Sequence, residues 1–323
     1  MNSRVFVVRN IFLVALLSAG IVCAQTYPER SVRVVIPHGP GGTNDIAGRI
    51  VFQKMTEQLR QQFVVENRVG AGSVIGETYF ATVPPDGYTL MVHSTTIVAN
   101  AVGRKNLPYD SRKAFVGVSP LAAQIGILGV HPSLPVRSIK ELVDLAKAKP
   151  GDVAYASAGN GSYTHMAMAY FNSMAGTSML HVPFKGGGVA AVGLASGEAQ
   201  VYVASYATYR PFIERKQVRL LGVVSTERIK ALPNLPTISE AGVSGYDFGS
   251  WVGVFVPAGT PKPVIDALHA AIGKALKDDD VQKRFDSLLL ETMYMTPEQF
   301  AQRLQSDFSK YEKITALTRA KVD

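Results

Sequence analysis

Two short loops carry the residues best suited to hold a small anion. Residues 38–45 and residues 157–164 each combine glycines with hydroxyl or carboxamide side chains just before an expected helix. Glycine lets a ligand approach the backbone closely, and a helix start offers free N–H groups and the positive end of the helix dipole. The pair therefore predicts one anion-binding element on each half of the molecule, although either loop alone also fits a turn that serves only helix packing.

Residues for catalysis or for a metal site are sparse. Gly161-Ser162-Tyr163 lacks the second glycine of a nucleophile elbow, and Ser162 with His165 at one helix start is more typical of capping and ligand hydrogen bonding. Neither loop fits the phosphate-loop or dinucleotide patterns. The histidines form no His-x-x-x-His and no Glu-flanked arrangement, so no metal site and no cofactor are expected. They are His38, His93, His131, His165, His181 and His269.

The elements that must position the two loops alternate between short apolar strands and amphipathic helices. This alternation is typical of an α/β fold with mostly parallel sheets flanked by helices. Residues 32–36 predict the strand before the first loop, and Thr43, Asn44 or Asp45 is expected to cap the helix after it. Residues 153–156 predict the strand before the second loop. Because ligands of such sheets bind at the carboxyl ends of strands, both loops lie where a ligand is expected.

Apolar segments divide the chain into two predicted lobes. Residues 115–130 are expected to carry the chain from one lobe to the other, and a strand over 252–256 follows its return. Two long amphipathic helices near the C-terminus would then pack on the first lobe. The predicted domains are a signal peptide over residues 1–24, a first lobe over residues 27–127 and 252–323, and a second lobe over residues 128–251.

The N-terminus has the architecture of a secretory signal peptide. Arg4 and Arg9 precede an apolar run over residues 11–17, and small residues follow as far as Ala24, where cleavage is expected. The run is shorter than the roughly 20 residues that span a bilayer. Cys23 is the only cysteine, and the residues before it fit a lipoprotein cleavage site poorly, so lipid anchoring is the less favoured alternative.

The charge pattern favours a receptor for anions over a nucleic-acid-binding protein. The chain has 33 Lys and Arg against 25 Asp and Glu, a formal net charge of +8. The basic residues are scattered along the chain and form no stripe with interleaved aromatic residues, which is the footprint of nucleic-acid binding. No nucleic-acid partner is expected.

Several sequence blocks recur, in order and with matching gaps, in a known family of exported proteins. They include Pro40-Gly41-Gly42-Thr43-Asn44-Asp45, Pro85-Asp86-Gly87-Tyr88-Thr89-Leu90, Ala156-Ser157-Ala158-Gly159-Asn160-Gly161-Ser162 and Pro257-Ala258-Gly259-Thr260-Pro261. With these blocks the chain resembles the tripartite tricarboxylate transporter receptor family, also called Bug proteins. The resemblance covers essentially the whole chain after the leader.

The resemblance implies a periplasmic solute-binding protein with a two-lobed Venus-flytrap fold. Such a receptor would capture a small carboxylate in the cleft between its lobes and deliver it to the membrane subunits of a tripartite tricarboxylate transporter. A monomer is expected. The alternatives are an extracytoplasmic ligand-sensing subunit for a signalling kinase and an exported carboxylate-processing enzyme.

The resemblance also places particular residues at the ligand. They are Gly41, Gly42, Thr43, Asp45, Ser94, Thr95, Ser157, Ser162 and Thr164, with His38, Gly159, His165 and Ala204 beside them. Three positions depart from the family's pattern. His38 stands where the family often has Phe, and it is either a further donor to an anion or a buried imidazole. Ala169 and Ala204 replace a frequent Glu and a frequent Asp, which argues against an amino-acid ligand because the carboxylates that would hold an ammonium group are absent.

Overall fold

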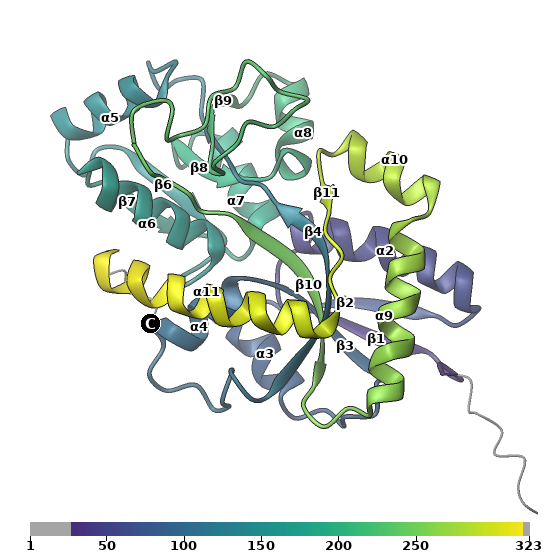
Figure 1. Ribbon diagram of the computed structural model, residues 1–323. Helices are drawn as coiled ribbons and strands as arrows, with labels where there is room; N and C mark the ends of the chain where they lie inside the picture. Colours follow the sequence, from purple (N-terminus) through teal and green to yellow (C-terminus); the bar gives the residue numbers. More distant parts are fainter. Residues whose placement is uncertain (1–26, 319–323) are drawn as a thin grey trace, which may run out of the picture.

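The computed structural model describes residues 27–318, which form two α/β lobes, each built on its own sheet (Figure 1). The expected signal peptide over residues 1–24, with Cys23, lies outside the described residues. Among residues 27–318, no helix combines the length and the apolar character that a membrane crossing requires.

The first sheet has six strands in the order β11-β4-β10-β3-β1-β2. β1 pairs in parallel with β2 and β3, whereas β10 runs antiparallel between β3 and β4. The short β11 closes the other edge, antiparallel to β4. The bounds are β1 (Val32–Ile36), β2 (Phe63–Asn67), β3 (Thr89–Ser94), β4 (Phe115–Gln124), β10 (Ser250–Pro257) and β11 (Glu291–Thr292).

The second sheet has five strands in the order β7-β6-β8-β5-β9. β6 pairs in parallel with β7 and β8, and β5 runs antiparallel between β8 and β9. The bounds are β5 (Ile127–Val130), β6 (Ala154–Ser157), β7 (Leu180–Pro183), β8 (Val201–Ala204) and β9 (Arg219–Val223).

Most strands of each sheet run in one direction, as the sequence predicts. The exceptions among the described strands are β10 and β11 in the first sheet and β5 in the second. Two of these lie where the chain crosses between the lobes. β4 leads into β5 across residues 125–126, and β10 begins where the chain returns. The two crossings lie side by side, because Gln124 at the end of β4 pairs with Ser250 at the start of β10.

Helices cover both faces of the first sheet. α2 and α9 pack together on one face with α10, whereas α4 and α11 pack on the other, beside α3 (Figure 1). α11 also contacts α6 of the second lobe, so the C-terminal helix bridges both lobes. The bounds are α2 (Thr43–Leu59), the 3-10 turn η1 (Ala71–Ser73), α3 (Val74–Phe80), α4 (Thr96–Gly103), α9 (Lys262–Leu276), α10 (Asp279–Ser287) and α11 (Pro297–Thr318).

The second lobe contains α5 (Ile139–Ala148), α6 (Tyr163–Ala175), α7 (Gly187–Ala195) and α8 (Tyr206–Glu214). The start of α5 shows how sequence fixes a helix end: the Ser138 hydroxyl accepts a hydrogen bond from the Glu141 backbone N–H, as the capping pattern predicts. α6 and α7 both contact β6 and β8, so their first turns lie close to the carboxyl ends of those strands.

The aromatic residues where the chain returns to the first lobe form part of the core. Trp251 is fully buried, packs edge to face on Phe300 of α11, and donates from Nε1 to Asp307 at 2.8 Å. Phe248 is also buried and contacts both Tyr163 of α6 and Tyr311 of α11. This packing ties the crossing to the helix that touches both lobes.

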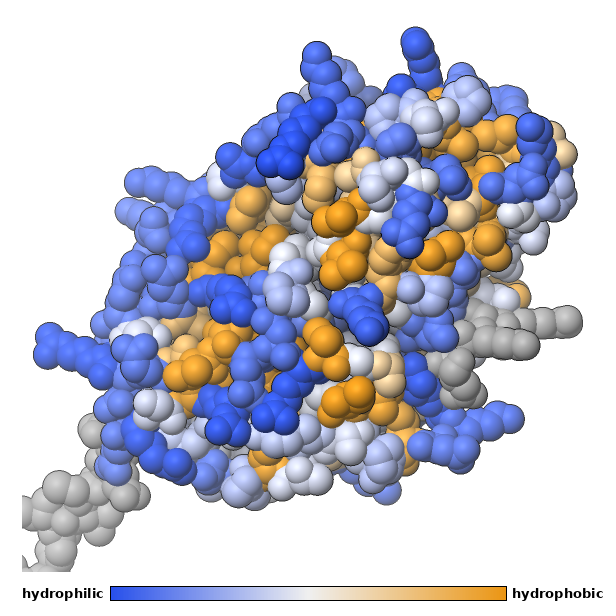
Figure 2. Space-filling view, turned by 180° about the vertical axis from the view of Figure 1, so that it is seen from behind, coloured by the Kyte–Doolittle hydropathy of each residue, from blue (hydrophilic) through white to orange (hydrophobic). Residues whose placement is uncertain are grey.

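The surface mixes charged and apolar side chains. Figure 2 shows hydrophilic residues spread over the back of the molecule, with smaller hydrophobic patches between them. Many scattered basic residues form helical ion pairs, such as Lys140 with Asp144 and Lys262 with Asp266. Exposed pairs of this kind contribute little to stability.

Candidate functional site

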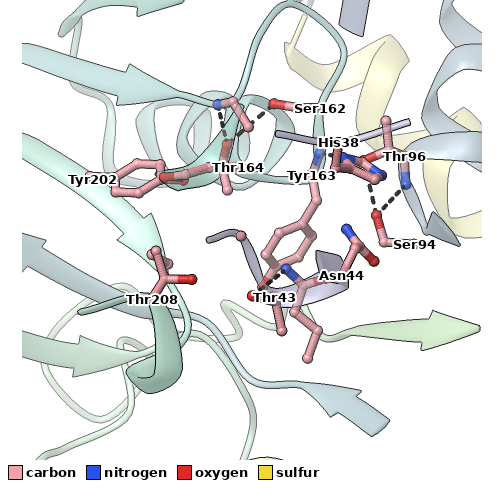
Figure 3. Close-up of a pocket in the computed structure, with 15 residues that line it drawn as sticks. His38, Thr43, Asn44, Ser94, Thr96, Ser162, Tyr163, Thr164, Tyr202 and Thr208 are labelled. Carbon is pink, nitrogen blue, oxygen red and sulfur yellow. Dashed lines mark hydrogen bonds between the residues drawn. The ribbon is translucent and has the colours of Figure 1, made fainter. Parts of the chain in front are cut away.

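A small cavity lies between the two sheets, lined by residues of both lobes (Figure 3). Its volume is about 30 Å³, which is room for about two water molecules. The first lobe contributes His38, Gly42, Thr43, Asn44, Ser94, Thr96 and Gln124, and the second contributes Ala158, Ser162, Tyr163, Thr164, Gly187, Tyr202, Ala204 and Thr208.

Five helix starts converge on this cavity. Thr43, Thr96, Tyr163 and Gly187 line it and are the first residues of α2, α4, α6 and α7, while Thr208 lies in the first turn of α8. Each start brings backbone N–H groups without a partner inside the helix and the positive end of a helix dipole. The combined field favours a negatively charged group at this point.

The lining contains no Lys, Arg, Asp or Glu among residues 27–318. Its polar groups are hydroxyls, carboxamides, one imidazole and backbone. Among the same residues, no group of three or more His, Cys, Asp or Glu is arranged to hold a metal ion. An anion in this cavity would therefore be held by dipoles and hydrogen bonds, which act strongly because the site is buried.

Hydroxyl groups of the cavity also join the two lobes. Thr43 Oγ1 donates to Ser205 Oγ at 2.9 Å, and Thr96 Oγ1 accepts from the Tyr163 backbone N–H at 3.0 Å. At the cleft rim, Arg104 Nη2 donates to the Asn160 carbonyl oxygen at 3.3 Å. These contacts show a closed arrangement, which explains why the cavity is small.

Asn44 is the one lining residue whose amide oxygen is left without a partner. Its side chain is 4% exposed, and Oδ1 is buried with no hydrogen bond. The oxygen and nitrogen of an amide are interchangeable by a flip, so Asn44 can offer either donors or an acceptor. An unsatisfied buried polar group costs about 1–3 kcal/mol, and a ligand that bonds to it would remove that cost. From the sequence, Asn44 is expected only as a candidate helix cap.

The structure brings seven of the expected site residues into the cavity lining. They are His38, Gly42, Thr43, Ser94, Ser162, Thr164 and Ala204. The other six expected residues lie outside the lining of this cavity. They are Gly41, Asp45, Thr95, Ser157, Gly159 and His165.

Asp45 shapes the first loop by two hydrogen bonds. Its carboxylate accepts from the Gly41 backbone N–H at 3.1 Å and from Arg49 Nε at 2.8 Å, and a third bond, from Asn67 Nδ2 at 2.9 Å, joins it to the neighbouring strand. The expected side-chain cap of α2 is wrong: the N-cap is Gly42, with no side-chain hydrogen bond. The helix begins at Thr43, and the Thr43 hydroxyl bonds to Ser205 of the other lobe instead of capping the helix.

In the second loop, buried side chains hold the backbone in place. Ser157 Oγ lies 2.6 Å from His181 Nε2, and His165 Nδ1 accepts from the Gly161 backbone N–H at 3.1 Å. The hydroxyl of Ser162 caps α6 by accepting from the His165 N–H. The first-lobe residue Thr95 turns away from the cavity toward Ser250 and Tyr311.

Burial lowers the pKa of three histidines near the two loops, His38, His165 and His181. Burial, followed by the proximity of His181, lowers the pKa of His165 to about 3, and burial lowers the pKa of His181 to about 4. The two rings stack with centroids 4.0 Å apart. In the first lobe, burial and then the proximity of His93 hold the pKa of His38 well below its usual value.

A larger groove adjoins the cavity. Its volume is about 320 Å³, and His38 and Ala158 line both spaces. The groove lies between residues 69–73 of the first lobe and residues 183–186 of the second, and Gly159 lies here. Its cationic residues are Arg104 and Lys185. The cavity and the groove together offer space for a ligand larger than the cavity alone could hold.

Comparison with known proteins identifies the family. A family model described as "Tripartite tricarboxylate transporter family receptor" matches residues 47–318. The chain belongs to this family. A Pseudomonas sp. strain P51 member, the UPF0065 protein in the tcbD-tcbE intergenic region, is 37% identical over 308 residues, 92% of each chain. Protein BugT of Bordetella pertussis is 30% identical over 323 residues, 99% of each chain.

Solved structures of similar receptors have the same fold. The Rhodopseudomonas palustris protein MatC with bound malate superposes with a TM-score of 0.85 at 29% identity, covering 89% of this chain and 99% of that one. R. palustris Rpa4515 with adipate gives a TM-score of 0.88 at 30% identity, covering 91% and 99%. The periplasmic binding protein BugD gives 0.87 at 28%, covering 91% and 99%. The expected receptor family and two-lobed α/β fold are confirmed.

Proposed function

We propose that this receptor captures a small organic acid by placing one carboxylate in the cavity where the five helix starts meet. The observation that carries the proposal is this convergence in a lining without a cationic side chain. The malate and adipate bound to the similar receptors support a carboxylate as the class of ligand. Function in the periplasm as a monomer, after cleavage near Ala24, is part of the same proposal.

Within the site, the acid's carboxylate would receive hydrogen bonds from the first turns of α2 and α6 and from Asn44. Because the cavity has room for about two waters, only the carboxylate end of an acid fits there while the lobes are closed. The rest of the molecule would extend past His38 into the adjoining groove. Ala204 in the lining offers no counter-charge to an ammonium group, so a simple organic acid is favoured over an amino acid.

The lobes are proposed to comprise residues 27–127 with 252–323, and residues 128–251. The membership of the strands supports this division, since β1–β4 and β10 share one sheet and β5–β9 share the other. Delivery to the membrane subunits of a tripartite tricarboxylate transporter is proposed because that is the role of the family.

A thermal-shift screen tests the proposal. Malate, adipate, citrate, benzoate, aspartate and glutamate are each added to the mature protein, and a ligand that binds only the folded state raises the melting temperature. We expect at least one organic acid to raise it and the two amino acids not to. Asn44→Leu should lose the response, whereas Asn172→Leu, which removes an α6 amide that bonds to Thr177 outside the cavity, should keep it. The proposal is contradicted if no acid raises the melting temperature.

Recovery of the bound acid separates a receptor from a carboxylate-processing enzyme. We expect the acid to be released chemically unchanged after denaturation of the complex. Conversion of the acid that disappears in Ser162→Ala or His165→Gln would instead favour the enzyme.

A further inference from the structure

His38 connects the cavity and the groove, together called the ligand space, to a buried row of two titratable groups, His93 and Glu77. Its ring lines both the cavity and the groove, and it is 8% exposed. Behind it, His38 Nε2 lies 3.3 Å from His93 Nδ1, and His93 Nε2 lies 2.7 Å from Glu77 Oε1. His93 and Glu77 are fully buried. The row runs from the ligand space into the core of the first lobe.

The hydrogen bonds fix where the protons lie in the ligand-free row. The Ser94 backbone N–H donates to His93 Nδ1 at 2.8 Å, so that nitrogen carries no proton. His93 therefore carries its proton on Nε2 and donates it to Glu77. His38 Nε2 must then be the donor to His93 Nδ1, and His38 Nδ1 accepts from the Ser73 hydroxyl at 3.4 Å. The free site for another proton is His38 Nδ1.

The charges around His38 favour an added proton once an anion is present. Glu77 is the buried carboxylate at the end of the row, where Asn100 also donates to it at 2.8 Å. Asn100 in turn accepts from Arg104 Nε, and Arg104 lies outside the small cavity but lines the adjoining groove with His38. Lys185 lines the groove from the second lobe and is exposed.

Asp45 is the remaining acidic group near His38. Asn67 bridges the two, donating to the His38 carbonyl oxygen and to Asp45 Oδ1, both at 2.9 Å. Asp45 is already paired with Arg49 at 2.8 Å, so it brings no free charge to the imidazole. A carboxylate ligand would thus face Glu77 across two imidazoles, and a proton on His38 would place a positive charge between the two anions.

We propose that His38 is a proton-coupled ligand contact: capture of a carboxylate is accompanied by uptake of one proton from solvent at His38 Nδ1. Glu77, acting through His93, is the positioning residue that stabilises the imidazolium. The inference rests on the proposed function, since it requires a carboxylate in the cavity.

Two physical consequences follow. In the ligand-free protein, burial and His93 lower the pKa of His38, so the added proton is absent at neutral pH. A bound anion raises that pKa again. At pH values between the pKa of His38 in the free protein and its pKa in the complex, the complex holds one more proton than the free protein. In that range Kd falls by up to tenfold for each unit that pH decreases.

Calorimetry measures this proton uptake directly. Malate, adipate and benzoate are the probes, and the one with the largest melting-temperature shift is titrated at pH 5.5, 6.5 and 7.5. Each titration is repeated in two buffers that differ in ionisation enthalpy. We expect uptake approaching one proton per ligand at the lower pH values, with Kd weakening as pH rises.

Variants assign the proton to His38. His38→Gln retains a hydrogen-bond donor but cannot titrate, so it should bind with no proton uptake and a flat pH profile. Glu77→Gln should reduce the uptake, whereas His269→Gln, remote on α9, should leave it unchanged. Nitrogen-15 spectra of the histidines in the unmodified protein give a second measurement: the His38 Nδ1 signal should take the protonated value only when ligand is present.

The possible failures are distinguishable. Binding of a probe without proton uptake between pH 5.5 and 7.5, or uptake that survives in His38→Gln, overturns this inference and leaves the proposed function intact. Failure of every acid in the thermal-shift screen overturns both.

Discussion

Replacing Gly188 with alanine should block closure of the lobes without harming either lobe. Gly188 is the second residue of α7, and a Cβ built there would lie 2.3 Å from the carbonyl oxygen of Pro40 in the first lobe. The Pro40 oxygen is a backbone atom, and the position of the Cβ is fixed by the backbone of residue 188, so neither atom can rotate away. The lobes would have to part by about 1 Å at this point to restore an ordinary contact distance.

The loss of affinity can be worked out from the closing contacts. Parting the lobes stretches hydrogen bonds across the cleft, among them Thr43 to Ser205, Tyr163 to Thr96, Arg104 to Asn160 and Thr208 to the Gly41 carbonyl oxygen. At about 0.5–1.5 kcal/mol each, the loss of these four bonds amounts to roughly 2–6 kcal/mol, or about 30- to 20,000-fold in affinity. Within α7 itself, alanine in place of glycine should stabilise the helix by about 0.5–1 kcal/mol.

Isothermal titration calorimetry and thermal unfolding check these two effects together. We expect Gly188→Ala to bind the acid much more weakly while its ligand-free melting temperature is unchanged or higher. Val189→Ala is the matched control, because it places alanine in the same helical turn at an exposed position. Unchanged affinity in Gly188→Ala would refute the argument that ligand binding requires the closed contact between these two backbones.

Three further predictions concern Asn44, the histidines and Thr43. Asn44→Leu should raise the ligand-free stability by about 1–3 kcal/mol, because it removes an unsatisfied buried oxygen, and should abolish acid binding; urea unfolding beside calorimetry measures both. Because the folded-state pKa of His165 is lowered to about 3, the unfolded chain binds more protons below pH 6.5, and His165 alone should lower the stability by about 2 kcal/mol from pH 8 to pH 5, in addition to the losses from His181 and His38, whose pKa values are also lowered. In His165→Gln that contribution should vanish, and an equal loss in both proteins would contradict it. Thr43→Val should weaken acid binding by about tenfold through loss of its 2.9 Å bond to Ser205; Thr56→Val, which removes hydroxyl bonds to the Phe52 carbonyl and the Phe63 N–H away from the cavity, is the control for loss of a threonine hydroxyl from α2.

The strand–loop–helix units that flank the cavity could be predicted because their signals are local. The apolar run of β1, the glycines after it and the amphipathic pattern of α2 are contiguous, and Ser162 caps α6 where expected. Helices α4 and α8 had no comparable signal. Thr96–Gly103 is apolar and rich in β-branched residues, and Pro211 interrupts the pattern of Tyr206–Glu214.

These two helices matter because their first turns complete the cavity. Thr96 and Thr208 reach it from parts of the chain more than 100 residues apart, so their contribution depends on how the lobes close. The free amide of Asn44 is also a tertiary property: sequence places Asn44 at a helix start, but only packing shows that no partner reaches its oxygen. Local pattern thus predicted the scaffold, and the contacts between lobes determined the site.

A crystal structure of the receptor with a bound acid tests the central claim most directly. We predict carboxylate oxygens within hydrogen-bond distance of backbone N–H groups at the starts of α2 and α6, beside Asn44, with the lobes closed. An acid bound instead through the side chains of Arg104 and Lys185 in the groove, with the helix starts unoccupied, would contradict the account.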